Sequence, residues 1–188
     1  MSNNVAVRFL KAIYSAFVSP PEVVGGPTTI VKLGEFTVNY GETIAEKIAD
    51  NTDPKRIGWC DREWTIGVGE NIPDQRKGKK RLKASAVKFG RTMSDADIVK
   101  WCANNKKICA TPKEGIDLAL ASPRPKLDNV MPLALAGQFF ADAGGSRNAL
   151  YFNHDSNRRA LFSVWLRTGE QWDDYWWFLV LEEISSAA

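Results

Sequence analysis

The chain has 188 residues, a formal net charge of +3 and 44% hydrophobic residues, including seven tryptophans. This composition supplies enough apolar material for a sizeable core and excludes a largely disordered protein. We expect a single domain over residues 1–188, because the length suits one core and no long linker rich in Ser, Gly or Pro divides the chain.

Membrane and secretory signals are not evident in the chain. No stretch approaches the roughly 18 uncharged apolar residues of a membrane-spanning helix. The N-terminus lacks the apolar block of a secretory signal, and the three cysteines are odd in number. We therefore expect no transmembrane segment, free thiols and a cytoplasmic location, or a virion if this is a viral structural protein.

The first predicted element is an amphipathic helix at residues 4–18, within an N-terminal arm over 1–21 that ends at two prolines. We expect this helix to pack on the protein's own core or on a neighbouring subunit, with a membrane surface as the alternative. The arm is therefore one of two segments through which a homo-oligomer is expected to form.

The next segments favour β-structure. Residues 28–33 and 35–40 are rich in β-branched and aromatic side chains and flank Gly34, which predicts a hairpin or a bulged strand pair. A short helix at 42–49 and a strand at Trp64–Val68 follow.

Charge is unevenly distributed along the chain. Residues 76–91 hold eight of the 25 Lys and Arg residues and no acid, whereas residues 169–188 hold five acids and no Lys or Arg. Such a basic segment predicts a polyanionic partner, and an acidic end that folds back onto it would mask it.

The basic segment is predicted to be helical, because Gly78 and Gly90 bound about three helical turns. A helical wheel places cations on one face and apolar side chains on the other, so that one side docks on the protein while the other meets phosphates. The predicted nucleic-acid-binding residues are Arg76, Lys77, Lys79, Lys80, Arg81, Lys83, Lys88 and Arg91.

The middle of the chain is predicted to be helical. Ser94 caps a helix at about 95–106, and Thr111 with Glu114 forms a capping box for a helix at 112–121. A third helix is predicted at Pro132–Ala141.

The C-terminal part favours strands again. Ala149–Phe152, Ala160–Leu166 and Tyr175–Leu181 predict a three-stranded meander, and a helix at Glu170–Ile184 is the competing prediction. The acidic, Trp-rich element at 169–188 is expected to belong to the core, with a subunit interface as the second choice.

Catalytic and metal signatures are weak. His154, the only histidine, would need an orienting carboxylate to act as a general base, and is more typical of a surface turn. Cys60, Cys102 and Cys109 lack the close pair spacing of structural zinc sites. We predict no catalytic residue, no metal site and no cofactor.

The sequence predicts an α+β fold with β-rich ends and a helical middle. Its predicted function is non-enzymatic binding of nucleic acid, RNA rather than DNA, in a self-assembling coat or nucleocapsid. The alternative is a protein-interaction module, an inhibitor or adaptor, that binds an acidic protein through the basic face and the C-terminal aromatics.

Overall fold

The computed structural model describes residues 28–49, 57, 59–60, 76–121, 126–141, 147–155, 158–167 and 170–184. The predicted N-terminal arm at 1–21 and the strand predicted at Trp64–Val68 lie outside the described residues. None of the helices in the described part has the length and apolar character needed to cross a bilayer.

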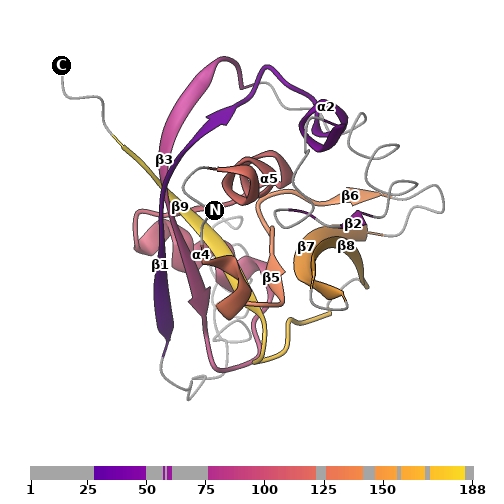
Figure 1. Ribbon diagram of the computed structural model, residues 1–188. Helices are drawn as coiled ribbons and strands as arrows, with labels where there is room; N and C mark the ends of the chain where they lie inside the picture. The colour runs from indigo at the N-terminus through magenta and orange to yellow at the C-terminus, as the bar shows by residue number, and fades with distance from the viewer. Residues whose placement is uncertain are drawn as a thin grey trace, which may run out of the picture.

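The described chain forms one mixed β-sheet with a few helices, which confirms the α+β class (Figure 1). The strands are β1 (Thr29–Asn39), β2 (Trp59–Cys60), β3 (Lys79–Lys88), β4 (Ile108–Cys109), β5 (Leu133–Ala134), β6 (Phe140–Ala141), β7 (Arg147–Asp155), β8 (Arg158–Leu166) and β9 (Trp177–Glu183). The helices are α2 (Ile44–Ala49), α4 (Asp95–Asn104), α5 (Pro112–Leu120) and the 3-10 helix η1 (Leu127–Asn129).

The strand order is β1-β3-β9-β5-β7-β8-β2, with β4 paired to β9 and β6 paired to β7. The β5–β9 and β2–β8 pairs are parallel, and the other pairs are antiparallel. The basic strand β3 therefore lies between β1 and β9, so the chain's most basic and most acidic segments are neighbours in the sheet.

Two clusters of buried apolar side chains lie on opposite faces of the β1–β3–β9 part of the sheet. Leu179 and Leu181 of β9 belong to the cluster that contains α5, whereas Phe178 and Val180 belong to the cluster that contains α4. Successive strand residues point to opposite faces, so β9 is buried on both sides. We call these the α5 cluster and the α4 cluster.

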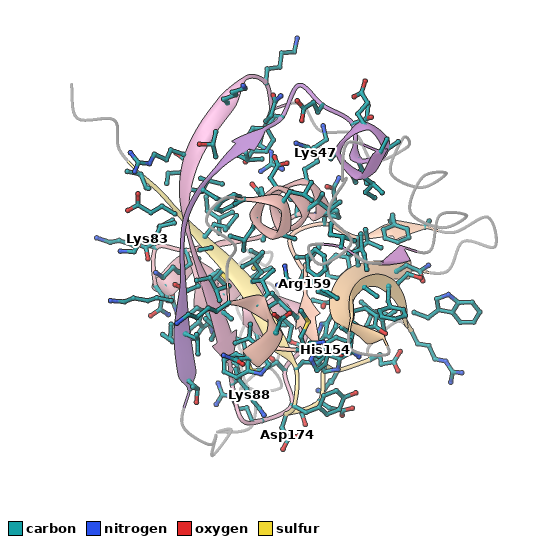
Figure 2. The ribbon with its side chains drawn as sticks, viewed as in Figure 1. Lys47, Lys83, Lys88, His154, Arg159 and Asp174 are labelled. Carbon is teal, nitrogen blue, oxygen red and sulfur yellow. The ribbon has the colours of Figure 1, made fainter. Side chains whose placement is uncertain are left out.

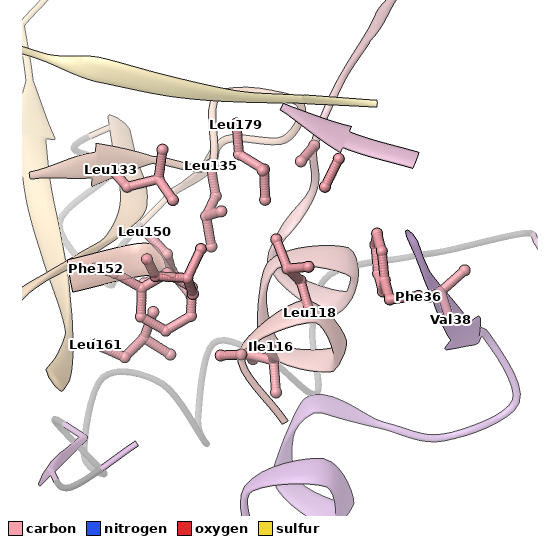
Figure 3. Packing of buried hydrophobic residues seen from close by; sticks show 14 of the residues in the cluster. Phe36, Val38, Ile116, Leu118, Leu133, Leu135, Leu150, Phe152, Leu161 and Leu179 are labelled. Carbon is pink, nitrogen blue, oxygen red and sulfur yellow. The ribbon is translucent and has the colours of Figure 1, made fainter. Parts of the chain in front are cut away.

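The α5 cluster fills the inside of the curved sheet. Figure 1 shows α5 between the β1–β3–β9 strands and the β7–β8 pair. In Figure 3, Ile116 and Leu118 of α5 lie between side chains of β1 on one side and side chains of β5, β7 and β8 on the other. Burial of both helix flanks gives α5 its fixed position against β1, which carries part of the candidate site.

The predicted hairpin around Gly34 is wrong, because Thr29–Asn39 is one strand along its whole length. Its pairing with β3 shifts register between Lys32 and Gly34, and Gly34 has a φ of 117°. A bulge with positive φ suits glycine, which has no Cβ to clash. Gly34 therefore bends one strand rather than separating two. The predicted helix at 42–49 is confirmed as α2.

The predicted helix within residues 76–91 is also wrong, because Lys79–Lys88 is strand β3. Leu82, Ala84 and Ala86 point into the α5 cluster, and Val87 points into the α4 cluster. Alanine and leucine suit a helix as well as a buried strand, so the wheel could not separate the two. Pairing with β1 and β9 outweighs the local helix propensity.

The helices predicted at about 95–106 and 112–121 are confirmed as α4 and α5. Ser94 caps α4, with the Asp97 backbone N–H donating to its Oγ over 3.1 Å. At α5, the Thr111 backbone N–H donates to Glu114 over 2.7 Å. Both starts are encoded locally, and the structure keeps them.

The helix predicted at Pro132–Ala141 is wrong. This segment contains the short strands β5 and β6 joined by a turn at Ala136 and Gly137. Leu133 and Ala134 are fully buried between β9 and β7. An apolar run of this length fits a central strand as well as a helix, and the neighbouring strands decide.

The C-terminal segments form three strands, as predicted, but not a meander. The β7–β8 pair is a hairpin, whereas β9 leaves β8 and inserts between β3 and β5. The competing helix at Glu170–Ile184 is wrong, because Trp177–Glu183 is extended.

Candidate nucleic-acid interface

The eight predicted cations do not share one face. Because Leu82, Ala84 and Ala86 face the α5 cluster, the alternation of a strand sends Lys80 and Lys88 to that side. The same alternation sends Lys79, Arg81 and Lys83 to the opposite side. Arg76 and Lys77 precede β3 and Arg91 follows it. Lys80 and Lys88 are eight residues apart, about 26 Å along a strand.

Residues of the neighbouring strands β1 and β9 lie on the same face of the sheet as the odd-numbered cations of β3. Lys83 lies opposite Glu35 of β1 and Glu182 of β9, and Ser85 lies opposite Lys32. Figure 2 shows Lys83 pointing away from the sheet on the side opposite α5. We call this surface the charged face, and it comprises Lys32, Glu35, Lys79, Arg81, Lys83, Lys107 and Glu182.

Basic residues outnumber acids on the charged face. Arg81 pairs with Glu35 at 2.7 Å, and Lys107 pairs with Glu182. Within the described residues, no salt bridge engages Lys32, Lys79 or Lys83. Among the described residues, these three lysines are therefore the cations of the charged face without an ion-pair partner.

The lysines of the charged face are close enough to repel one another. The pKa of Lys107 lies below its ordinary value of 10.5, first because its side chain is largely buried and then because Lys83 and Lys32 are nearby. A bound anion would offset this repulsion. The same group of like charges without an anion opposes folding.

The acidic C-terminal element does fold onto the basic strand. Glu183 accepts a hydrogen bond from Lys80 at 2.7 Å, and Glu182 lies on the charged face. Both acids belong to β9, which is hydrogen-bonded into the sheet. They therefore reduce the positive charge permanently, and a competing polyanion cannot displace them without unfolding the sheet.

Arg76 takes part in a buried network rather than in the charged face. Its guanidinium lies 2.6 Å from buried Glu114, 3.1 Å from Thr111 and 4.2 Å from the centroid of the Tyr40 ring. Tyr40 also donates a hydrogen bond to Glu114. These contacts give Arg76 a structural role.

The remaining predicted cations lie away from the charged face. Lys77 is exposed beyond the start of β3, and Lys88 lies at the far end of the strand opposite Thr29 and Trp177. The Arg91 Nε donates to the sulfur of Met93 at 3.3 Å. Three of the eight predicted residues, Lys79, Arg81 and Lys83, thus form the centre of the site.

Sequence reasoning missed Lys32 and Lys107, which join the charged face from outside the basic segment. Lys32 lies in a β-favouring run, where alternation alone would have indicated a charged side. No local signal marks Lys107, because its proximity to Lys83 depends on the pairing of β4 with β9.

Sequence reasoning also missed a buried ion pair between α2 and α5. The Lys47 Nζ lies 2.6 Å from Asp117 Oδ2 and 3.3 Å from Glu42, and the Lys47 side chain is 1% exposed. Burial is the main cause that raises the pKa of Asp117 above 3.8. Perturbed carboxyl groups often mark active sites. Here Asp117 accepts hydrogen bonds from Lys47 and from the Asn39 backbone, so the arrangement joins α5 to α2 and β1.

The structure does not bring His154 and Arg147 together, as an enzyme site built on these two side chains of β7 would require. His154 is exposed, with Nε2 3.2 Å from the Asp128 carbonyl oxygen. Arg147 pairs with Asp95 and lies 3.7 Å from the centroid of the Phe139 ring. The two residues are seven positions apart on β7, about 23 Å. They do not form a common pocket.

The described residues include no group of three or more His, Cys, Asp or Glu side chains that could hold a metal ion. Cys102 and Cys109 do come together, with their sulfur atoms 3.0 Å apart, although the sequence offers no zinc-like spacing around them.

Most C-terminal tryptophans lie in the core. Trp172 and Trp176 are buried in the α4 cluster and contact each other edge-on, with ring centroids 5.0 Å apart. Trp165 of β8 is 64% exposed. Trp165 precedes the 169–188 element, and Tyr175 within that element is 49% exposed, so these two aromatic side chains are the candidate anchors for a partner in this part of the described chain.

The comparisons with known proteins gave no significant match to a protein-family model, to a curated protein or to a solved structure.

Proposed function

We propose that this protein binds nucleic acid through the charged face and performs no chemistry of its own. The observation that carries the proposal is the convergence of Lys32, Lys79 and Lys83 on one sheet face without an ion pair among the described residues. Anions that bind there replace lysine–lysine repulsion by attraction.

The charged face favours recognition of the phosphate backbone. Its members are lysines, one arginine and two glutamates, and none is aromatic. Base stacking requires aromatic or guanidinium planes, and sequence readout requires groups that reach base edges. Arg81 is engaged by Glu35. Binding is therefore expected to depend on salt and to show little sequence preference.

The salt dependence has a calculable size. Each neutralised phosphate of a duplex contributes about −0.9 to the slope of log K against log salt. If Lys32, Lys79 and Lys83 each neutralise one phosphate, the slope is about −2.7, and the affinity falls about 40-fold between 50 and 200 mM salt.

Two double variants of β3 test the proposal. Lys79→Ala/Lys83→Ala removes two charges from the charged face, whereas Lys80→Ala/Lys88→Ala removes two charges from the opposite side of the same strand. Fluorescence anisotropy with labelled single-stranded RNA and duplex DNA at two salt concentrations measures both. We expect the first variant to lose the salt-dependent binding and the second to keep most of it.

The outcomes separate the alternatives. Equal losses in both variants would indicate a diffuse charge effect and contradict a defined site. A larger loss in Lys80→Ala/Lys88→Ala would place the site on the α5 side of β3 and contradict the charged face as the binding site. No binding by the wild type at low salt would refute nucleic-acid binding. Affinity for RNA above that for duplex DNA would support the RNA preference.

A protein-interaction module is the second candidate, and the exposure of Trp165 favours it. An acidic protein partner would meet the charged face, and Trp165, on β8 beyond β5 and β7 in the strand order, would form a separate aromatic contact. Such an interface is less sensitive to salt than phosphate binding. Loss of partner binding in Trp165→Ala, with weak salt dependence, would support this candidate.

Assembly around nucleic acid, as in a coat or nucleocapsid in a virion or the cytoplasm, belongs to the same proposal. Trp165 would serve as the subunit contact, because Trp172 and Trp176 are used in the core. Light scattering of the wild type and Trp165→Ala, with and without RNA, tests it, and a monomer in every sample would contradict it.

A further inference from the structure

Cys102 and Cys109 form a close pair, although their spacing in the sequence is not that of a metal-binding motif. Cys102 lies in the last turn of α4, and Cys109 lies in β4, which pairs with β9. Their sulfur atoms are 3.0 Å apart, and both thiols are free. The turn between α4 and β4, with Lys106 at a φ of 54°, brings them together.

The structure holds this pair in place from both sides. Cys102 is buried in the α4 cluster with Ile98 and Met93. Cys109 lies opposite Val180, and its carbonyl oxygen would be 2.2 Å from a Cβ at position 137. Gly137 therefore permits the close backbone approach that fixes β4. Formation of a bond between the sulfur atoms needs only a small movement.

The two thiols differ in access and in acidity. Cys102 is 3% exposed, whereas Cys109 is partly exposed. The pKa of Cys109 is lowered, chiefly by the hydrogen bond from the Cys102 thiol, and the pKa of Cys102 is raised by that same bond and by burial. Cys109, the more exposed residue, is thus the better nucleophile, and buried Cys102 stays a thiol beside it.

We propose that Cys102 and Cys109 form a reversible oxidative modification site, in which a hydroperoxide converts the dithiol to an intramolecular disulfide. The Cys109 thiolate attacks the peroxide O–O bond, which gives a sulfenic acid on Cys109 and releases hydroxide, which takes up the proton that Cys109 had lost. The Cys102 sulfur then attacks the Cys109 sulfur, and the sulfenic oxygen leaves as water with the Cys102 proton. Two thiols lose two electrons, and one hydrogen peroxide becomes two waters.

The third cysteine is remote in the sheet. Cys60 lies in β2 at the edge beyond β8, whereas Cys109 reaches the sheet through β9, and β5, β7 and β8 lie between the two. A pairing of Cys60 with either member of the dithiol is therefore not expected. The proposal for this cysteine pair does not rest on nucleic-acid binding.

Peptide mapping of the full chain tests the proposal directly. Purified reduced protein is treated with hydrogen peroxide, its free thiols are alkylated, and trypsin cleaves after Lys100, Lys106, Lys107 and Lys113. Cys102 and Cys109 then fall in the separate peptides 101–106 and 108–113. We expect these peptides to appear cross-linked, the free thiols to fall from three to one per chain, and dithiothreitol to reverse both changes.

Three single variants test the order of events. Cys102→Ser is expected to accumulate a Cys109 sulfenic acid that dimedone traps, and Cys109→Ser to resist peroxide. Cys60→Ser is the matched control and should form the same cross-link. Circular dichroism checks that each variant is folded. If a variant does not fold, the peptide map of the wild-type chain identifies the cross-linked cysteines. Free glutathione under the same conditions shows whether the peroxide dose is sufficient. A cross-link to Cys60 would overturn the proposal, and so would the absence of a cross-link at a dose that oxidises glutathione fully.

Discussion

Removal of one partner of the Lys47–Asp117 pair is expected to destabilise the fold strongly. In Asp117→Asn, Lys47 stays buried with a 1% exposed side chain and only Glu42, at 3.3 Å and 45% exposed, to offset its charge. Uncompensated buried charges of this kind cost about 3–5 kcal/mol. For a chain of this length, that corresponds to a fall in Tm of about 6–20 °C.

The double variant Lys47→Met/Asp117→Asn distinguishes a buried charge from a lost contact. Methionine keeps much of the apolar stem of lysine, and a buried ion pair replaced by uncharged groups often leaves stability nearly unchanged. We therefore expect the double variant to recover most of the loss. Glu42→Gln, at an exposed partner, should cost less than about 1 kcal/mol.

The dependence on pH provides a second check through Asp117. Burial raises its pKa in the folded chain, and Lys47 opposes that rise. In Lys47→Met the folded pKa should rise further, so the folded state binds the proton more tightly than the unfolded chain. The stability from that proton is full below the unfolded pKa and is lost as pH rises through the folded pKa. The cost of Lys47→Met should therefore be larger at pH 7 than near pH 4.

Urea unfolding followed by tryptophan fluorescence measures these free energies. A cost below about 1 kcal/mol for Asp117→Asn would mean that Lys47 reaches water in the folded protein. A double variant less stable than both single variants would mean that the losses come from lost contacts and not from an uncompensated buried charge.

Three further predictions concern other parts of the fold. The pKa of Asp97 in the folded chain is lowered, chiefly by the hydrogen bond from the Ser94 hydroxyl. The contribution of Asp97 to the free energy of unfolding is therefore full above pH 3.8 and is lost as pH falls through the folded pKa. Asp97→Asn should cost about 0.5 kcal/mol at pH 6 and less at pH 3, measured by urea unfolding; an equal cost at both would contradict the capping role. Gly137→Ala should cost about 3 kcal/mol, because its Cβ meets backbone atoms of Cys109 and Ala110, and thermal unfolding tests this. The disulfide between Cys102 and Cys109 should raise the free energy of unfolding by about 2.5 kcal/mol, measured with and without dithiothreitol; no change would show that the bond strains the fold.

Helices with a local start signal could be predicted from the sequence. Ser94 and Thr111 carry their capping partners three residues ahead, and the contacts that satisfy the helix ends lie within that short stretch. The C-terminal strands were also predicted, because their β-branched and aromatic runs lie between polar turns. In each case the determining contacts lie between near neighbours in the chain, so the sequence of one segment is sufficient to predict the helix or strand.

The conformation of residues 79–88 could not be predicted in the same way. Leu82, Ala84 and Ala86 fit a helix or a strand, and only the partners β1 and β9 decide between them. This error also affected the site, because a helix groups Arg81 with Lys80 and Lys88, whereas a strand groups Arg81 with Lys79 and Lys83. The choice of face follows from the pairing.

By itself the sequence determined the basic segment, the α+β class, the capped helices and the number of C-terminal strands. These depend on composition, on periodicity and on contacts between near neighbours. The folded chain is needed to place β9 beside β3, Lys32 and Lys107 on the charged face, and Lys47 against Asp117. Such contacts join residues far apart in the chain. The stabilising free energy of these contacts comes from burial and strand pairing, so it cannot be read from the sequence of a single segment.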